Sequence, residues 1–356
     1  MASKVELLDN AEEIDKIDVS GMLRTVCRLP EMIAEAERLT AYVSLPPPQR
    51  FAQVLVLGMG GSAIAGDLAA DLFLKQANAP IIPWRNYNLP EYVSPDTLVC
   101  ALSYSGDTEE TLTAVKEAAK KGARIVCVTS GGKLKELAES AKHPFFLIPA
   151  NYQPRAALPY LLIPLIVTLE KLKVVPGATE GFKEAVELLQ KLRDEYGPAK
   201  PARLNPVKQL AKKLSGKLPA IFGAAGTTGA VALRWKTQLN ENGKLTALVN
   251  VFPELNHNEI VNLGALKREN NNFALVVLRD ESENERIKKR IEITKSLLVR
   301  QLGGVSEVAS QGKSFLARLF SLIFFGDLLS VYLAVLKGVD PTPVEAIARL
   351  KKELNR

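Results

Sequence analysis

The sequence is poor in the residues that form disulfide bonds or bind metals. Its 356 residues include 3 cysteines and 2 histidines. Scattered cysteines in an odd number argue against a disulfide scaffold and favour a reducing compartment. The cysteines and histidines are also too few and too dispersed for a zinc site. We therefore expect a cytoplasmic protein that needs no metal.

Uninterrupted apolar runs, basic tails and signal-like N-termini are also missing. The apolar stretches 158–169 and 320–336 are broken, the first by prolines and the second by Gly326-Asp327. A membrane span needs about 18 uninterrupted apolar residues. The net charge is +7, but basic clusters such as Lys288-Lys289-Arg290 alternate with apolar residues at helical spacing and few aromatic residues interleave with them. We expect no membrane partner and no nucleic-acid partner.

Apolar residues are abundant enough for a large core. Hydrophobic residues make up 47% of the chain, and the length suggests two domains at about 150 residues each. Three apolar strand patterns in the first half each end in a polar turn and are each followed by a helical pattern; they cover 54–57, 97–102 and 124–128. This alternation predicts an α/β fold with a parallel sheet flanked by helices. Ligands bind such sheets at the carboxyl ends of the strands.

The same scheme recurs in the second half of the chain. Three segments of the second half resemble three of the first half in the same order: 220–229 resembles 55–64, 273–278 resembles 98–103, and 305–313 resembles 125–133. An internal duplication therefore predicts two tandem doubly wound domains.

The domain boundaries follow from proline-rich and polar stretches. Pro46-Pro47-Pro48 stops a helical N-terminal segment, and the polar stretch from Pro198 to Pro206 is the best linker candidate. We expect four parts: a helical segment over 1–45, a first domain that binds phosphate over 46–197, a second domain over 205–340, and a C-terminal helix over 341–356 that contributes to the active site.

Three hydroxyl residues follow the second strand of the first half. Ser103, Ser105 and Thr108 cluster on one turn before a helix, where hydroxyls and free amides favour an oxyanion such as phosphate. Helix capping would explain one of them but not three. The corresponding turn of the second half carries Asp280, Glu281 and Glu283, which would repel phosphate. We therefore expect one phosphate site, in the first domain.

A glycine-rich loop follows the first strand. Gly58-x-Gly60-Gly61-Ser62 could be a dinucleotide fingerprint, a tight turn that only packs, or a loop that approaches substrate closely. The dinucleotide interpretation needs an acidic residue about 20 residues further on, and Ile81-Ile-Pro-Trp-Arg-Asn-Tyr offers none in place. We favour a substrate loop in which Gly61 and Ser62 contact the ligand, and we expect no cofactor.

These motifs in combination resemble a known family. Gly-x-Gly-Gly-Ser-Ala-x-Ala-Gly-Asp and Ser-x-Ser-Gly-x-Thr-Glu-Glu-Thr are similar to motifs of the sugar isomerase (SIS) fold family. With Gln238-Leu-Asn-Glu, Pro253-Glu-Leu-Asn-His and the segment from Asp340 to Lys351, the chain resembles the bifunctional phosphoglucose/phosphomannose isomerases from about residue 20 to its end. The resemblance implies conversion of glucose 6-phosphate, and of mannose 6-phosphate, to fructose 6-phosphate through a cis-enediol.

The chemistry of that reaction needs particular groups. A general base must move a proton between C1 and C2, a positive charge must stabilise the enediolate, and a second acid/base pair must open the ring. The resemblance places the base on Glu241, the positive charge on Arg155, and ring opening on His257 with Lys351. On the residues alone, each could equally be a solvated or satisfied polar side chain.

Three assignments stay open. Lys352 or Lys337 could replace Lys351, which we prefer because it lies on the Val344 and Ile347 side of the helix, a side expected to face the protein. Thr342 is a weaker candidate for contacting the sugar near C2. His143 matches no motif and is interpreted as a surface residue.

The family resemblance also implies a partner, a second copy of the chain. Similar proteins are homodimers in which the partner subunit supplies a histidine, so we expect a homodimer with a shared active site. Two rivals remain: a non-catalytic sugar-phosphate-binding module, which would usually carry a fused DNA-binding segment, and another SIS-type sugar-phosphate isomerase. An aminosugar synthase would need a glutaminase domain with an N-terminal cysteine, and the chain begins Met1-Ala-Ser.

Overall fold

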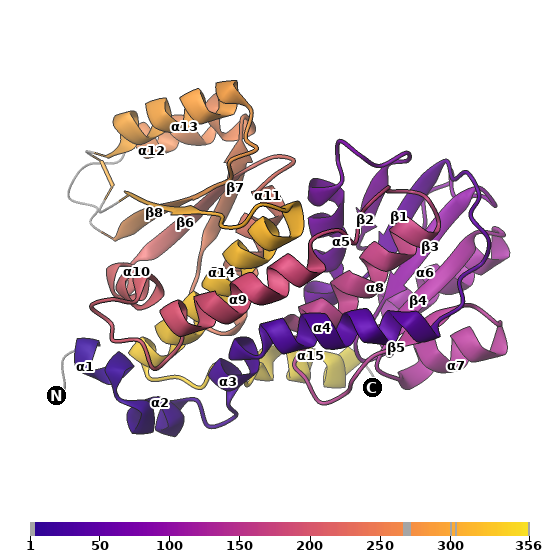
Figure 1. Cartoon of the computed structure of the whole chain (residues 1–356), viewed down its shortest axis with the longest axis horizontal. Helices are drawn as coiled ribbons and strands as arrows, with labels where there is room; N and C mark the ends of the chain where they lie inside the picture. Colours follow the sequence, from indigo (N-terminus) through magenta and orange to yellow (C-terminus); the bar gives the residue numbers. More distant parts are fainter. Residues whose placement is uncertain (1–3, 266–271, 300, 303–304, 355–356) are drawn as a thin grey trace. The chain divides into compact units, whose positions relative to one another are not determined.

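A computed structural model describes residues 4–265, 272–299, 301–302 and 305–354, and shows two parallel sheets flanked by helices (Figure 1). The chain divides into two compact units that interleave along the sequence. The first-sheet unit consists of Arg28–Leu188 and Gly312–Leu319, and the second-sheet unit of Met1–Cys27, Leu189–Gln311 and Phe320–Arg356. The expected α/β class with two sheets is confirmed, whereas the expected domain boundaries stay predictions.

The first sheet has five parallel strands in the order β2-β1-β3-β4-β5. Its strands are β1 (Gln53–Leu57), β2 (Ile81–Trp84), β3 (Thr97–Leu102), β4 (Arg124–Thr129) and β5 (Phe145–Leu147). The strand order reverses between β1 and β3, and crevices for ligands form at the carboxyl ends of strands at such a reversal. The glycine loop follows β1 and the three hydroxyl residues follow β3, so both motifs lie at the carboxyl ends of the strands where the order reverses.

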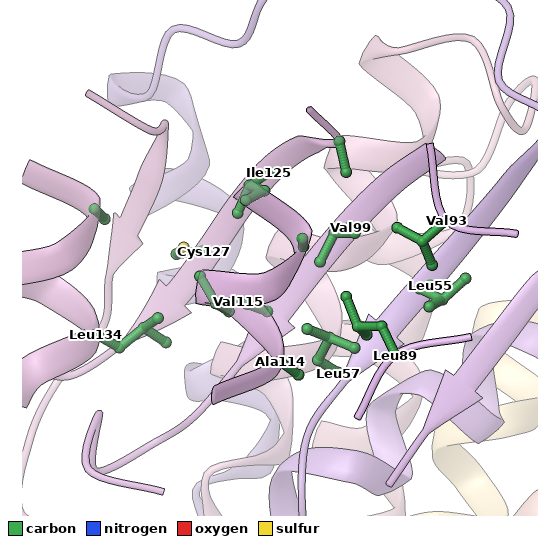
Figure 2. Packing of buried hydrophobic residues seen from close by; sticks show 14 residues of the cluster. Leu55, Leu57, Leu89, Val93, Val99, Ala114, Val115, Ile125, Cys127 and Leu134 are labelled. Carbon is green, nitrogen blue, oxygen red and sulfur yellow. The ribbon is translucent and has the colours of Figure 1, made fainter. Parts of the chain in front are cut away.

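Helices cover both faces of the first sheet. They are α4 (Leu29–Leu39), η1 (Thr40–Tyr42), α5 (Gly60–Leu72), α6 (Glu109–Lys120), α7 (Gly132–Ser140), η2 (Pro154–Ala156) and α8 (Leu158–Lys171). On one face, Leu55, Val99 and Ile125 of the strands pack against Val115 of α6 and Leu134 of α7 (Figure 2). On the other, α5 and α8 pack together, and α8 also packs against α4. Near-continuous apolar strands such as β3, which is buried at all six positions, are what burial on both faces requires.

The second sheet repeats this topology. Its strands are β6 (Leu218–Ala224), β7 (Leu248–Phe252), β8 (Phe273–Arg279) and β9 (Val305–Ala309), in the order β7-β6-β8-β9. That order matches β2-β1-β3-β4, so the duplication expected from the sequence appears as one topology used twice. The helices of this unit are α1 (Lys4–Asp9), α2 (Ala11–Ile17), α3 (Met22–Cys27), α10 (Pro206–Leu214), α11 (Gly229–Glu241), η3 (Glu254–His257), α12 (Glu259–Ala265), α13 (Glu285–Leu298) and α15 (Glu345–Leu354).

Two further helices, α9 (Phe182–Tyr196) and α14 (Phe315–Lys337), contribute residues to both units. Within the part of the chain that the structure describes, α14 is long and apolar enough to cross a membrane by length and composition, but 94% of its apolar window is buried in the protein. The Gly326-Asp327 pair, expected to break this apolar stretch, lies inside the continuous helix. Gly326 leaves room for the indole of Trp235, and Asp327 pairs with Arg234. We therefore assign α14 as a core helix.

Candidate active site

Residues 103–108 between β3 and α6, here called the phosphate turn, hold the three predicted hydroxyls together. Ser103 is buried, and its Oγ donates to Thr108 Oγ1 at 3.0 Å. Ser105 is exposed, and its Oγ accepts the Asp107 N–H at 3.3 Å. Thr108 precedes α6 but makes no side-chain capping bond. Helix capping therefore does not account for this hydroxyl, and the first turn of α6 keeps amides for an anion.

Ser62 connects the glycine loop to the phosphate turn. It lies in the first turn of α5, is buried, and its Oγ accepts the Tyr104 N–H at 3.1 Å. This bond crosses from the end of β1 to the end of β3, the point where the strand order reverses. The two motifs that the sequence predicts as one binding edge are thus joined in the structure.

Arg155 lies beside the same glycine loop. A Cβ on Gly61 would come within 2.8 Å of the Arg155 nitrogen, so only glycine lets α5 and η2 approach this closely. Arg155 is 3% exposed and therefore not the solvent-exposed arginine that was the alternative interpretation. A guanidinium keeps its charge even when buried, so it can supply positive charge here.

Sequence reasoning missed two residues, one within the phosphate turn and one just after it. Asp107 Oδ1 accepts the Lys133 N–H at 3.1 Å, so a carboxylate of the chain itself occupies the start of α7. Thr111, in the first turn of α6, is 1% exposed, and its hydroxyl has no hydrogen-bond partner among the described residues. Thr111 ends the run Thr108-Glu-Glu-Thr, which could have indicated this residue, but the run is also typical of a helix-capping pattern.

The corresponding turn of the second sheet is filled by the chain's own carboxylates. Glu283 is 4% exposed and accepts the Asp280 N–H at 2.8 Å, while Arg279 Nε donates to it at 3.1 Å. Burial raises the pKa of Glu283, against the opposing effects of those bonds. Asp280 Oδ2 accepts the hydroxyl of Ser310 at 2.7 Å. Negative charge at this turn is what the sequence comparison of the two halves led us to expect.

Glu241 is the last residue of α11 and is half-buried. Lys244 Nζ donates to the backbone oxygen of Glu241 and, at 2.9 Å, to that of Pro341. It thereby brings Thr342, the weaker sugar-contact candidate, close to the end of α11. Sequence reasoning missed Lys244. Lys337 Nζ, one alternative to Lys351, donates to the Lys244 oxygen and is thus occupied with the backbone.

His257 lies at the end of the second sheet opposite to Glu241. It ends η3, just after β7, and is exposed. Because α11 runs back from the carboxyl end of β6, Glu241 lies near the amino end of β7 and His257 beyond its carboxyl end. A strand of β7's length spans about 16 Å at ~3.3 Å per residue. One chain's second-sheet unit therefore does not bring Glu241 and His257 together.

Two expectations about single residues are wrong. No residue of α15 is buried, and Ile347 is 43% exposed, so the described residues do not bury the Lys351 side of this helix. The apolar stripe of this amphipathic helix is exposed in the part of the chain that the structure describes. His143 is half-buried rather than a surface residue; burial lowers its pKa, and Nε2 has no partner among the described residues.

Comparisons with known proteins agree with this organisation. Residues 50–158 match the SIS domain family, and residues 203–354 match the bacterial phospho-glucose isomerase C-terminal SIS domain. A bifunctional phosphoglucose/phosphomannose isomerase of Caldicellulosiruptor bescii is 44% identical over 94% of this chain and 98% of its own length. The chain belongs to the bifunctional phosphoglucose/phosphomannose isomerase family.

More distant relatives extend the comparison. An isomerase of the same name from Thermoplasma acidophilum is 37% identical over 86% of this chain and 90% of its own length. A solved structure, a glucose-6-phosphate isomerase like protein from Thermus thermophilus, has a TM-score of 0.61 at 22% identity and covers 97% of this chain and 98% of that one. At that identity the solved structure supports the fold alone.

Proposed function

We propose that this member of the phosphoglucose/phosphomannose isomerase family interconverts glucose 6-phosphate, and mannose 6-phosphate, with fructose 6-phosphate through a cis-enediol. The observation that carries the proposal is the 44% identity to a curated isomerase along nearly the whole chain. The clustered hydroxyls at the β1–β3 reversal support it, because this edge suits an anionic sugar ester.

The proposal gives each group one role. Gly61 and Ser62 bind the substrate together with Ser103, Ser105 and Thr108, and the last three bind mainly its phosphate. Glu241 moves the proton between C1 and C2 of that substrate, and Arg155 stabilises the enediolate oxygen. His257 and Lys351 open the sugar ring, as the family resemblance implies. No step in this scheme uses a metal or a cofactor.

We propose further that the enzyme is a homodimer with shared active sites. The separation of Glu241 and His257 by the length of β7 supports this, because a histidine from a second copy can reach where the chain's own cannot. Val261, four residues after His257, is 72% exposed, and α15 has no buried residue. Exposed apolar side chains next to a functional residue are typical of an interface.

The cytoplasm is the proposed location. The three cysteines form no disulfide bond with one another, and Cys100 and Cys127 are buried. Burial raises the pKa of Cys127 to about 12, which keeps its thiol protonated and unreactive. Free structural thiols of this kind fit a reducing compartment.

A coupled assay with fructose 6-phosphate tests the proposal. Wild type is expected to form both glucose 6-phosphate and mannose 6-phosphate, and Glu241→Gln is expected to lose about 10³-fold in kcat, because an amide cannot accept the proton. Glu285→Gln, which changes an exposed carboxylate of the same unit, is the control and is expected to match wild type.

Other outcomes would favour the rivals. Equal rates for wild type and Glu241→Gln would show that Glu241 is not the general base. Calorimetric binding of fructose 6-phosphate without turnover would favour the non-catalytic binding module, and turnover of a different sugar phosphate alone would favour another SIS-type isomerase.

A further inference from the structure

Tyr104 lies at the centre of the phosphate turn and is 6% exposed. Its backbone joins two neighbouring loops. The N–H donates to Ser62 Oγ at 3.1 Å, and the oxygen accepts the N–H and the hydroxyl of Ser130 at 3.0 and 2.6 Å. Tyr104 thus ties the start of α5 to the turn after β4, with the phosphate turn between them.

The phenol of Tyr104 reaches a third loop. Its hydroxyl donates to the Pro149 oxygen at 2.9 Å and accepts the Tyr152 N–H at 2.8 Å. Both partners are backbone groups of the segment 148–153, which leads from β5 into η2. The hydroxyl therefore holds this segment at two points, one near each end, and Arg155 follows three residues after the second.

The start of η2 has a second fixed point. The missing side chain of Gly61 lets the Pro154–Arg155 backbone lie against α5. The two restraints come from elements that follow two neighbouring strands: Gly61 lies at the start of α5, after β1, and the Tyr104 phenol belongs to the turn after β3. Together they determine where the backbone of Arg155 lies relative to the phosphate turn.

We propose that Tyr104 is a positioning residue for the isomerisation, whose hydroxyl holds Arg155 at a fixed place relative to the bound phosphate. A phenylalanine would fill the same space but leave the Tyr152 N–H and the Pro149 oxygen without this partner. Both groups are partly buried, and a group of this kind that loses its partner rearranges or loses the stabilisation of the bond. The inference rests on the proposed function, because it assumes that Arg155 acts on the sugar.

Burial also keeps the phenol in its donor form. It raises the pKa of Tyr104 above its ordinary value, so the hydroxyl stays protonated throughout the neutral range. Both bonds to the segment 148–153 are then available whenever the enzyme works.

The test is Tyr104→Phe, measured with fructose 6-phosphate and with inorganic phosphate as a competitive inhibitor. We expect kcat to fall about 10- to 100-fold, as small displacements of a catalytic group do. The KM and the inhibition constant of phosphate should stay within about twofold, because the backbone bonds to Ser62 and Ser130 remain. In an Arg155→Ala background the same substitution should have little further effect, since its target is gone.

Tyr332→Phe is the matched control for stability. Tyr332 is fully buried, and its hydroxyl donates to the Tyr196 oxygen at 2.8 Å, far along the chain from the phosphate turn. It should lower the unfolding midpoint without changing kcat. If Tyr104→Phe does not fold, Ser130→Ala removes one bond to the Tyr104 oxygen and should lower kcat in the same direction by a smaller factor.

The outcomes separate this inference from the proposed function. An equal kcat loss for Tyr104→Phe in wild-type and Arg155→Ala backgrounds would overturn the positioning role, while Glu241→Gln stays inactive. Unchanged kcat with weaker phosphate inhibition would also overturn it, because Tyr104 would then support only the anion site. Full activity of Glu241→Gln would instead defeat the proposed function itself.

Discussion

At Gly61 the chain has room for a hydrogen atom but not for a carbon. A Cβ there would lie 2.8 Å from the Arg155 nitrogen and 2.9 Å from the Pro154 carbonyl carbon. Both neighbours are backbone atoms, which cannot rotate away as the end of a side chain can. A methyl group at this position must therefore move η2, and Arg155 with it.

Gly61→Ala is accordingly expected to lower kcat by about 10²-fold, the loss that a displacement near 1 Å can cause. Gly66→Ala is the control in the same helix, because its Cβ would meet the side chain of Val56 at 3.0 Å rather than η2. Steady-state kinetics with fructose 6-phosphate measure both variants. A Gly61→Ala enzyme as active as Gly66→Ala would show that the close approach is not needed.

At the same scale, sequence reasoning found what is local and missed what is distant. The three hydroxyls of the phosphate turn lie within six residues, so their clustering is visible in the sequence. The bond from Tyr104 to Tyr152 joins residues 48 positions apart, and Lys244 meets Pro341 across 97 positions. Neither contact leaves a periodic or compositional signal, because each depends on how loops meet at a sheet edge.

At the scale of elements, α11 and α14 share a polar seam. Arg234 and Gln238 of α11 both bind Asp327 of α14, through Nε at 3.1 Å and Nε2 at 2.8 Å. One turn further on, Asn242 Nδ2 donates to Ser330 Oγ at 2.9 Å. Burial raises the pKa of Asp327, whereas Arg234 and Gln238 lower it. The seam holds the helix whose last residue is Glu241.

Asp327→Ala leaves a buried Arg234 without this partner, and breaking a buried pair from one side costs about 3–5 kcal/mol. We expect a clear drop in the thermal unfolding midpoint. Glu285→Ala, which removes an exposed partner of Lys288, should not change the midpoint measurably. Midpoints that fall equally in both variants would mean that burial of the pair does not determine its contribution.

Elements with a strong pattern were predictable, and those defined by tertiary contacts were not. Apolar strand patterns that end in polar turns predicted both sheets, because strands buried on two faces need continuous apolar runs. Gly326-Asp327 interrupts the apolar run of the sequence but not the helix, because Gly326 packs against Trp235 and Asp327 pairs with Arg234. The side of α15 that carries Ile347 was expected to face the protein, but no residue of α15 is buried among the residues that the structure describes.

At the scale of the whole molecule, the two sheets share one topology but carry different side chains at corresponding turns. The first sheet places hydroxyls at its β1–β3 edge, and the second places Glu283 and Asp280 at the corresponding β6–β8 edge. Duplication therefore gave the chain two folds of the same kind but one edge suited to phosphate. The remaining groups, Glu241 and His257, lie at opposite ends of the second sheet.

That separation makes subunit complementation the most direct test of a shared active site. Glu241→Gln and His257→Ala chains, each inactive alone, are unfolded together, refolded as a mixture and assayed with fructose 6-phosphate. Half of the dimers would then be hybrids, and each hybrid would have one site with an intact glutamate and a partner's intact histidine. We predict recovery of about a quarter of wild-type activity. A refolded mixture no more active than the separate variants would contradict the account.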